Sequence, residues 1–532
     1  MKHTTSHWVT AFSLLFISTC FVVPSFASTL SRAEATSKNM QPDIPRKQQE
    51  QETSKILSEL ATKNGKRPNI IWLLVDDLGY GDIGGVWGGG DVVGAATPNI
   101  DKLAAEGLAL TSVYSQPTCT PTRSAMMLGR LPIRTGLIRP ILAGDKVAVN
   151  PWEGEASIGQ LLSDAGYHTV LTGKWHTGEE EGMRPWEVGF DEFQGYYASQ
   201  KEITQQFDDK RYPDLVLDEE KAAAFKKAAG HIDMFYGQKG KGQDVVEETT
   251  SIEQFVQADQ KLMDFTVDKI KALSKEDKPF FIYHNFLRVH ADNYPSKEFK
   301  GASESKYPYK DNVVEVDYLV GEVMKALADA GIEENTFVFF TSDNGPQRDT
   351  WPDSGYTPFR GGKASAWEGG VRVPGIAYWK GVIQPRHSTG LFDLMDLFNT
   401  SLTLGGVAMD TLPADRYYDG IDQSSFLVAP NGQSKREHIY IWTQTELAAI
   451  RIREYKMHFQ ATQELSDFMG IDYSIKQQVG LSPWLFNLYI DPKEEMPLGH
   501  RLNPWLASIA ADAKEHIKTL KQFPPKDVGL KQ

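Results

Sequence analysis

The stretch IIWLLVDD, residues 70–77, decides the fold class of this chain. Six consecutive apolar residues are typical of a strand that is buried on both faces, as in the centre of a parallel sheet. The run ends in two aspartates, Asp76 and Asp77, and a glycine-rich stretch covers residues 79–90. Ligands of open α/β sheets bind beyond the carboxyl ends of the strands, so the two aspartates lie where a site is expected.

The next 270 or so residues alternate between two kinds of pattern. Helical patterns cover residues 98–107, 157–165, 255–273 and 313–330, and strand patterns cover residues 169–171, 280–283 and 337–340. This alternation predicts an α/β domain with a mostly parallel mixed sheet sandwiched by helices. Polar groups end four of the strands: Asp76 with Asp77, Lys174 with His176, His290, and Asp343 with Asn344. We therefore expect these side chains to share one site.

The pattern changes near residue 430. Short alternating runs at residues 438–442, 449–453, 455–459 and 484–490 predict a smaller C-terminal domain with an antiparallel sheet over residues 431–532. The first domain is predicted to span residues 67–430. Its polar segment 201–260 is expected to be an insertion or lid near the site entrance. Residues 28–66 are predicted to form a mobile polar arm, with a short helix near residues 56–60.

The N-terminus has the features of an export signal. Lys2 precedes an apolar run over residues 8–23, and the small residues Ser25 and Ala27 follow. This pattern predicts a cleaved signal over residues 1–27, and hence a periplasmic or secreted protein. A membrane anchor and a lipid attached to Cys20 are the alternatives, but the run is shorter than the ~20 residues of a spanning helix. No stable membrane span is expected after cleavage.

Composition excludes several classes of protein. The 532 residues include 56 Lys and Arg against 70 Asp and Glu, a net charge of −14, which argues against a nucleic-acid partner held by a broad basic surface. The two cysteines, Cys20 and Cys119, exclude a disulfide-rich scaffold and a cysteine-built zinc site. Signal cleavage would leave Cys119 alone, and a single cysteine in an exported protein is either buried filler or a reactive group.

The segment SQPTCTPTRSAMMLGR, residues 115–130, gives Cys119 a chemical context. Pro121, the helix formers after it and Gly129 predict a short helix, with Cys119 just before its N-terminus. The free N–H groups and the dipole of such a helix favour an anion. Arg123, one turn further on, adds a fork suited to oxyanions. On this segment alone, a buried thiol followed by a surface arginine remains an equal alternative.

The same segment carries a family resemblance. CTPTR at residues 119–123, followed by LGR at residues 128–130, resembles the signature of the type I sulfatases of the alkaline phosphatase superfamily. Other segments resemble that family in the same order: residues 71–79, TPNIDKLA at 97–104, GYHT at 166–169, GKWH at 173–176, TSDNGP at 341–346, FRGGK at 359–363 and WEGGVRVP at 367–374. The similarity covers about residues 67–400, with a weaker match near residues 485–492.

The resemblance implies an alkaline phosphatase-like fold and an arylsulfatase-like hydrolase of sulfate esters. It also implies that a formylglycine-generating enzyme, an expected partner, oxidises Cys119 to formylglycine. Thr122 and Leu128 differ from the residues that are commoner in the signature, which bears on how efficiently that enzyme reads it.

The resemblance also implies a metal site. Asp76, Asp77, Asp343 and Asn344 offer oxygen ligands, and calcium tolerates irregular oxygen geometry better than magnesium does. In the family, these positions hold Ca²⁺, or sometimes Mg²⁺, and an oxygen of the formylglycine at position 119 completes the shell. Each aspartate segment alone would also suit an ordinary turn or helix cap.

Further roles follow from the resemblance. Lys174 and Lys363 would hold sulfate oxygens as point charges, and Arg123 would hold the formylglycine hydrate. His290 or Lys363 would protonate the leaving alcohol, and His176 would accept a proton from the hydrate so that sulfate is released.

Two other functions remain open at this point. Some relatives with the same cysteine motif hydrolyse phosphonate monoesters or phosphodiesters. An exported binding protein that has lost its chemistry is the second alternative. The substrate is expected to be an aryl or carbohydrate sulfate, and the sequence does not specify which.

Overall fold

The structure is a computed structural model that describes residues 30–142, 145–228, 232–462, 476–478, 483–499 and 503–530. The predicted export signal, residues 1–27, lies outside these ranges. Within them, no helix combines the length and the apolar character that crossing a membrane requires.

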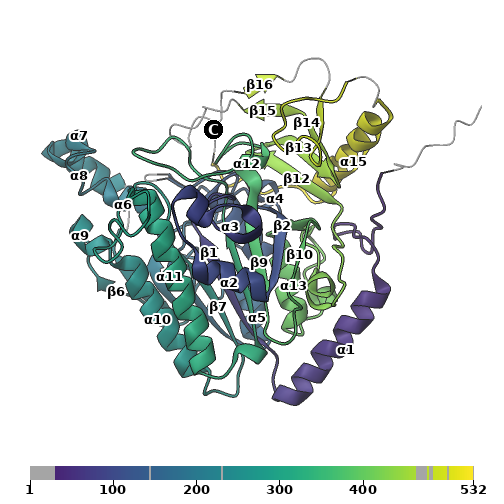
Figure 1. The fold of residues 1–532 in the computed structure, drawn as a ribbon, viewed down its shortest axis with the longest axis horizontal. Helices are drawn as coiled ribbons and strands as arrows, with labels where there is room; N and C mark the ends of the chain where they lie inside the picture. The colour runs from purple at the N-terminus through teal and green to yellow at the C-terminus, as the bar shows by residue number, and fades with distance from the viewer. Residues whose placement is uncertain are drawn as a thin grey trace, which may run out of the picture.

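An eleven-stranded mixed sheet forms the centre of the large domain, in the order β10-β2-β9-β8-β1-β7-β3-β4-β5-β6, with β11 paired to β2 (Figure 1). Its strands are β1 (Asn69–Val75), β2 (Leu108–Tyr114), β3 (His168–Lys174), β4 (Glu192–Tyr196), β5 (Met234–Gln238), β6 (Gly242–Glu247), β7 (Phe280–Asn285), β8 (Thr336–Ser342), β9 (Arg372–Tyr378), β10 (Arg386–Ser388) and β11 (Phe392–Asp393). The five central strands, from β8 to β4, are parallel, and antiparallel pairs lie on both sides of them. The predicted mixed, mostly parallel sheet is therefore confirmed.

Strand β1 explains the layered arrangement, because its side chains alternate between two hydrophobic cores. Ile70, Trp72 and Leu74 pack into one core, and Ile71, Leu73 and Val75 pack into the other. The second core contains residues of α2 (Pro98–Glu106), α10 (Ala258–Leu273) and α11 (Pro308–Asp329). The first contains residues of α3 (Cys119–Leu128), α5 (Ile158–Asp164), α13 (Asp396–Leu404) and α14 (Ser424–Val428). A fully apolar strand is thus the direct consequence of helices on both faces.

The smaller C-terminal sheet is antiparallel, as expected. Its four strands are β12 (His438–Thr443), β13 (Glu446–Ile452), β14 (Tyr455–His458) and β17 (Trp484–Asn487), and α15 (Asn503–Gln522) packs against them. A separate pair joins β15 (Gln460–Thr462) to β16 (Lys476–Gln478). The division of the chain at residue 430 stays a prediction.

The N-terminal segment differs from the expected arm with a short helix. Helix α1 (Lys47–Asn64; purple, at the lower right of Figure 1) has 18 residues, buries Thr53 and Leu57, and packs against α14. The Lys435 ammonium lies 2.8 Å from a carboxylate oxygen of both Asp43 and Glu50, which ties this segment to the start of the C-terminal region. These partners lie almost 400 positions away in the sequence, so local composition could not reveal them.

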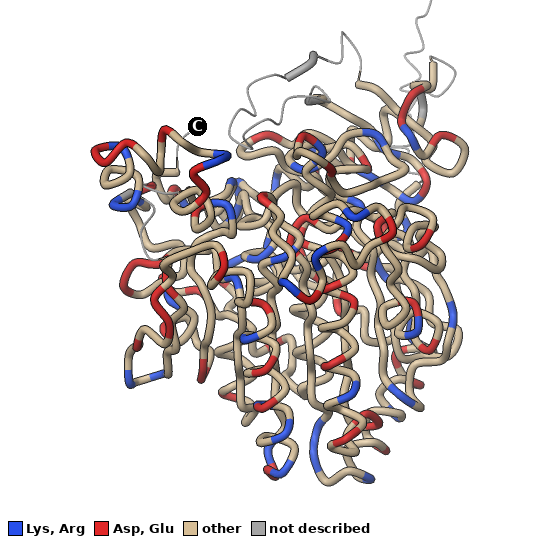
Figure 2. The backbone as a smooth tube through the Cα atoms, turned by 60° about the vertical axis from the view of Figure 1, so that its left-hand side comes forward, with Lys and Arg blue, Asp and Glu red and all other residues tan. Residues whose placement is uncertain are grey.

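The segment 201–260 is also more regular than expected. It contains α7 (Pro213–Val216), α8 (Glu219–Ala228) and α9 (Ile252–Phe255), and α6 (Gln200–Thr204) begins just before it. Strands β5 and β6 belong to the large sheet, where they extend the edge beyond β4. Its role as a lid stays a prediction. Acidic and basic residues are interspersed along the backbone in Figure 2, so the dense charge of the site described next is local.

Candidate active site

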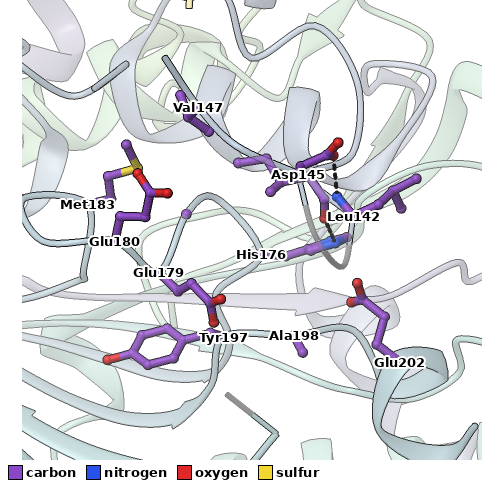
Figure 3. Close-up of a pocket in the computed structure, with 12 residues that line it drawn as sticks. Leu142, Asp145, Val147, His176, Glu179, Glu180, Met183, Tyr197, Ala198 and Glu202 are labelled. Carbon is purple, nitrogen blue, oxygen red and sulfur yellow. Dashed lines mark hydrogen bonds between the residues drawn. The ribbon is translucent and has the colours of Figure 1, made fainter. Parts of the chain in front are cut away.

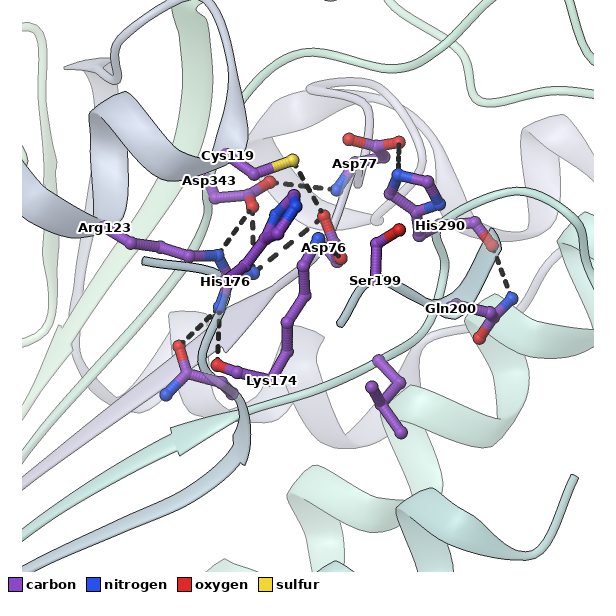
Figure 4. Close-up of polar contacts among 12 residues, drawn as sticks. Asp76, Asp77, Cys119, Arg123, Lys174, His176, Ser199, Gln200, His290 and Asp343 are labelled. Atoms are coloured by element: carbon purple, nitrogen blue, oxygen red, sulfur yellow. Dashed lines mark hydrogen bonds and ion pairs between the residues drawn. The ribbon is translucent and has the colours of Figure 1, made fainter. Parts of the chain in front are cut away.

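The predicted site residues meet at the carboxyl edge of the central strands, next to the first turn of α3 (Figure 4). Asp76 and Asp77 follow β1, Lys174 ends β3, His290 lies a few residues beyond β7, and Asp343 and Asn344 follow β8. Cys119 and Arg123 belong to α3, and Lys363 comes from the glycine-rich loop before α12 (Glu368–Val371). All ten predicted site residues are less than 9% exposed, so the cluster is buried as a unit.

The backbone at three of these segments takes the left-handed conformation that non-glycine residues rarely adopt. The φ angles are +61° at Asp77, +54° at His176 and +69° at Ala364. This conformation costs about 1 to 2 kcal/mol per residue. Tertiary contacts hold it, for example the 2.7 Å hydrogen bond from the Ala364 N–H to the Pro117 carbonyl, which fixes the loop of Lys363 next to the segment before Cys119. Such strain concentrates where side chains must be aimed at one point.

Cys119 is the first residue of α3, one position further into the helix than expected. Its side chain is fully buried, and its Sγ lies 3.5 Å from Oδ1 of Asp76. Burial, with the negative charge of Asp343, raises the pKa of this thiol well above its usual value. The thiol is therefore neutral and enclosed, whereas reactive cysteines are partly exposed thiolates.

Arg123 is 1% exposed, so the alternative of a surface arginine is wrong. Its Nη2 and Nε lie 2.9 and 3.2 Å from Oδ2 of Asp343, and its Nη1 donates to Oδ1 of Asn285 at 2.8 Å. The guanidinium thus joins the ends of β7 and β8. Asn285, which the sequence interpretation missed, is the last residue of β7, and its position at a strand end was the available signal.

Each of the two lysines faces one aspartate of the pair. Lys174 Nζ lies 2.6 Å from Oδ2 of Asp76, and Lys363 Nζ lies 2.8 Å from Oδ2 of Asp77. Burial favours the neutral amine, but the facing carboxylates outweigh it and raise the pKa of both lysines. Burial likewise opposes ionisation of Asp77, but Lys363 lowers the pKa of that carboxyl below its usual value. Lys363 and Asp77 therefore form an ionised pair, and Lys174 carries its positive charge.

The neighbours of His290 define its tautomer. Its Nδ1 lies 2.5 Å from the carbonyl oxygen of Ala291, which can only accept, so Nδ1 carries the proton. Its Nε2 lies 3.2 Å from Lys363 Nζ and accepts from that ammonium. Burial and the charge of Lys363 hold the pKa of His290 well below its usual value. Lys363 and His290 therefore form one proton-bearing pair.

His176 has the opposite tautomer and a free acceptor. Its Nε2 lies 3.0 Å from the Ile141 carbonyl oxygen and donates to it. Its Nδ1 is buried and has no hydrogen-bond partner in the described part of the chain. Burial, together with the nearby charge of Lys174, holds the pKa of His176 well below its usual value. A neutral imidazole with an open lone pair can accept a proton.

The carboxylate and amide oxygens of the cluster suit a hard divalent cation. Asp76, Asp77, Cys119 and His290 each offer one ligand atom, and these atoms lie within 4.8 Å of one another. Asn344 Nδ2 donates to Oδ1 of Asp77 at 2.7 Å, whereas the buried Oδ1 of Asn344 has no partner among the described residues. A buried amide oxygen without a donor is costly unless it has a ligand. Asp343 is linked to the pair through its Oδ1, which accepts from the Asp77 N–H at 3.1 Å.

Gln200 is a second residue that the sequence interpretation missed. It begins α6, and its Nε2 donates to the carbonyl of His290 at 2.6 Å and to that of Asp292 (Figure 4). It therefore holds the loop that carries His290. No sequence signal identified it, because a glutamine in a polar segment has many roles.

A small pocket of about 70 Å³ opens beside His176 (Figure 3). Its wall contains four carboxylates, together with Tyr197 and Met183: Asp145, Glu179, Glu180 and Glu202. Asp145 is paired with Arg139, at 2.6 Å, and Glu202 caps α6. The pocket therefore offers hydrogen-bond acceptors beside His176.

Two family models match the chain. One, described as sulfatase, matches residues 68–407, and the other, the C-terminal region of aryl-sulfatase, matches residues 434–528. The chain is 34% identical to the N-acetylgalactosamine-6-sulfatase of Canis lupus familiaris over 456 residues, which is 81% of each chain. It is 31% identical to an arylsulfatase of Hemicentrotus pulcherrimus, over 84% of this chain and 81% of that one.

A solved structure agrees over nearly the whole length. The crystal structure of the PsFucS1 sulfatase from Pseudoalteromonas sp. superposes with a TM-score of 0.89 at 48% sequence identity, and the match covers 94% of this chain and 99% of that chain. The mixed sheet with its flanking helices and the small antiparallel sheet are thus shared with a sulfatase.

Proposed function

The chain belongs to the sulfatase family and hydrolyses sulfate esters; within this activity we propose that it removes sulfate from a carbohydrate, using a formylglycine made from Cys119 and a bound divalent cation. The observation that carries the proposal is the position of Cys119. Its side chain lies 3.5 Å from Asp76, in a buried cluster that holds three carboxylates and the three cations Arg123, Lys174 and Lys363. A neutral, enclosed thiol is a poor nucleophile, so oxidation of this side chain is the more consistent route to activity.

The proposed ligands of the cation are Asp76, Asp77, Asp343, Asn344 and the oxygen of the modified residue 119. Ca²⁺ is the favoured ion and Mg²⁺ the alternative, because the ligands come from three separate segments and calcium tolerates irregular geometry. The uncompensated Oδ1 of Asn344 supports this assignment. The formal negative charges of the three aspartates equal the positive charges of the three cationic side chains. A bound divalent cation would therefore leave a net positive charge that favours a sulfate group.

The formylglycine hydrate would supply a hydroxyl that attacks sulfur and a second hydroxyl whose deprotonation releases the sulfate. The open Nδ1 of His176 is the proposed acceptor of that proton. The Lys363 and His290 pair holds a proton that it can give to the leaving alcohol. Lys174 and Lys363 would hold sulfate oxygens, and Arg123 would fix the modified residue through its bridge to Asp343.

A carbohydrate is the proposed substrate because of the pocket beside His176. Its carboxylates suit the hydroxyl groups of a sugar, which donate hydrogen bonds. The name of the N-acetylgalactosamine-6-sulfatase shows that one relative acts on a sugar sulfate. We also propose export of the chain through residues 1–27 and maturation by a formylglycine-generating enzyme. N-terminal sequencing of the protein from its own host would show the cleavage after residue 27.

Mass spectrometry of the peptide that contains residue 119, combined with turnover of 4-nitrophenyl sulfate and of a panel of sulfated sugars, tests the proposal. We expect an aldehyde at position 119 and loss of turnover in Cys119→Ala, with an unchanged urea unfolding curve. Cys119→Ser should also fail, because serine lacks the second hydroxyl. An unmodified, fully active Cys119 would refute the formylglycine route, and turnover of aryl but not sugar sulfates would refute the carbohydrate assignment.

A further inference from the structure

A second pocket, of about 310 Å³, lies between the N-terminal segment, the β10–β11 turn and the β13–β14 turn. Five arginines line it: Arg32, Arg46, Arg436, Arg451 and Arg453. Glu454 is the one acidic residue in its lining, and no residue of the catalytic cluster takes part. An arginine-rich hollow away from the chemistry needs its own explanation.

Two of these arginines are occupied by the protein itself. Arg436 is 3% exposed, forms two contacts with the Asp396 carboxylate and donates to the His438 carbonyl at 3.0 Å. Arg451 is 1% exposed, and its Nε donates to the Arg453 carbonyl at 2.7 Å. The guanidinium groups of Arg436 and Arg451 are thus engaged by the protein. Arg32, Arg46 and Arg453 are the arginines that can contact a ligand.

The next two arginines share one carboxylate. The Nε of Arg32 lies 3.2 Å from Oε1 of Glu437, and the Nε of Arg453 lies 2.9 Å from the same oxygen. That carboxylate therefore compensates two cations. The Arg32 side chain is 57% exposed and that of Arg453 is 28% exposed, so both retain N–H groups that can reach a ligand.

The Arg46 guanidinium has no direct partner, although the charge of the Glu437 carboxylate acts on it from further away. Within the described ranges its guanidinium makes no hydrogen bond and no ion pair, and its Nε is buried without an acceptor. Burial lowers the pKa of Arg46, and the charge of Arg32 lowers it further. A buried N–H of a charged group has a free-energy cost when it lacks an acceptor, and the Nε of Arg46 is such a group. A bound anion would remove that cost.

The rest of the lining has the character of a sugar site. The side chains of Ser388, Thr389 and Gln433 can exchange hydrogen bonds with hydroxyl groups. The ring of Tyr489 lies at the rim and is 65% exposed, which suits stacking on the face of a sugar ring. We propose that this pocket is a second binding site, in which Arg46, Arg32 and Arg453 hold an oxyanion group, a sulfate or a carboxylate, of an anionic polysaccharide.

Such a site would hold a polymer on the enzyme while the catalytic cluster acts on one of its units. The oxyanion part of this inference rests on the pocket alone, and the choice of a carbohydrate as its carrier rests on the proposed function. Guanidinium groups suit both oxyanions because their planar fork matches paired oxygens.

Affinity electrophoresis of the full chain in gels that contain dextran sulfate, carboxymethyl-dextran or unmodified dextran tests the proposal. Arg46→Gln is the test variant, and Lys47→Gln, which removes an exposed cation one residue away and outside the pocket, is the matched control. We expect Arg46→Gln to weaken binding to dextran sulfate about tenfold, as loss of one charge-assisted contact does. Lys47→Gln should change it less than twofold, by roughly the effect of a screened surface charge.

The three gels separate the sources of the oxyanion. Retardation by dextran sulfate alone assigns a sulfate site, and retardation by both charged polymers assigns a general oxyanion site. Equal retardation of Arg46→Gln and Lys47→Gln, or no greater retardation in charged than in neutral gels, would overturn the proposal. Turnover of 4-nitrophenyl sulfate is measured in parallel and should be unchanged in Arg46→Gln. A wild type without turnover but with Arg46-dependent retardation would refute the catalytic proposal and leave the binding site standing.

Discussion

The carboxylate of Glu494 accepts a 2.7 Å hydrogen bond from the backbone N–H of Glu368, and this contact joins the C-terminal region to the first residue of α12. Lys456 Nζ lies 2.9 Å from Oε1 of Glu368 and 3.1 Å from Oε1 of Glu494, and all three side chains are fully buried. Lys363 lies five residues before Glu368, so this network supports the loop that carries a proposed catalytic lysine. The C-terminal sheet therefore helps to position the site without touching it.

Glu494→Ala should lower the free energy of unfolding by about 3 to 5 kcal/mol, because it leaves Lys456 buried and without half of its compensation. Glu494→Gln keeps the shape and should cost less. Urea unfolding followed by fluorescence would measure both, with the exposed Glu495→Ala as the matched control. An effect of Glu494→Ala no larger than that of Glu495→Ala would show that the network does not stabilise the fold.

Lys363→Ala should slow the hydrolysis of a sugar sulfate more than that of 4-nitrophenyl sulfate. A sugar alkoxide needs a proton to leave, which is worth about 10²- to 10⁴-fold in rate, whereas 4-nitrophenolate leaves without one. Lys174→Ala is the comparison. It removes the other lysine that is proposed to hold sulfate, the one that faces Asp76, and it should slow the hydrolysis of both esters alike. The kcat of each variant is measured on both esters. If Lys363→Ala lowers kcat by the same factor on both, Lys363 binds sulfate and does not protonate the leaving alcohol.

Gly173→Ala should destabilise the protein more than Gly166→Ala does. The φ angles of the two glycines are nearly equal, +93° and +92°, so the conformational cost of the added Cβ, about 1 kcal/mol, is shared. At residue 173 that Cβ would lie 1.7 Å from the Asn285 carbonyl oxygen, whereas at residue 166 no atom lies within 4 Å. Urea midpoints of the two variants measure the difference. Equal midpoints would mean that β3 and β7 separate without cost.

Glu192→Gln should change how stability depends on acid pH. Three donors reach the Glu192 carboxylate: His168, Tyr236 and Lys269. Burial opposes its ionisation, but these donors outweigh burial and lower its pKa to about 2. The folded state therefore holds the proton less tightly than the unfolded state, whose pKa is about 4.3. The stabilisation is complete above that value and is lost as pH falls towards 2.

At pH 7 we expect Glu192→Gln to be less stable than the wild type by about 1 to 2 kcal/mol, after allowance for partial exposure of the site. The difference should shrink between pH 4.5 and pH 3, because in this range the unfolded wild type takes up a proton at residue 192 that the folded state does not bind, whereas the variant has no carboxyl group there. Urea midpoints at pH 6, 4.5 and 3.5 would follow it. A constant difference across this range would mean that the carboxylate contributes through packing and not through charge.

The sequence predicted the parts of the site that depend on local pattern. The continuous apolar run before Asp76 predicts a strand with helices on both sides, and polar residues at strand ends predict convergence at one edge of the sheet. The N-terminal segment shows where this reasoning ends. Helix α1 buries only Thr53 and Leu57, and its partner α14 begins at residue 424, far from it in the sequence.

By itself, the sequence determined the α/β class, the antiparallel C-terminal sheet and the resemblance to sulfatases, because strand periodicity and short motifs are local properties of the chain. Only the tertiary structure decided that Asn285 fixes Arg123, that Gln200 fixes the loop of His290, and that each lysine faces a different aspartate. It also decided the tautomers of the two histidines, since each depends on which carbonyl lies next to a ring nitrogen. These contacts depend on the relative placement of segments that are far apart in sequence, and that placement results from packing across the whole sheet.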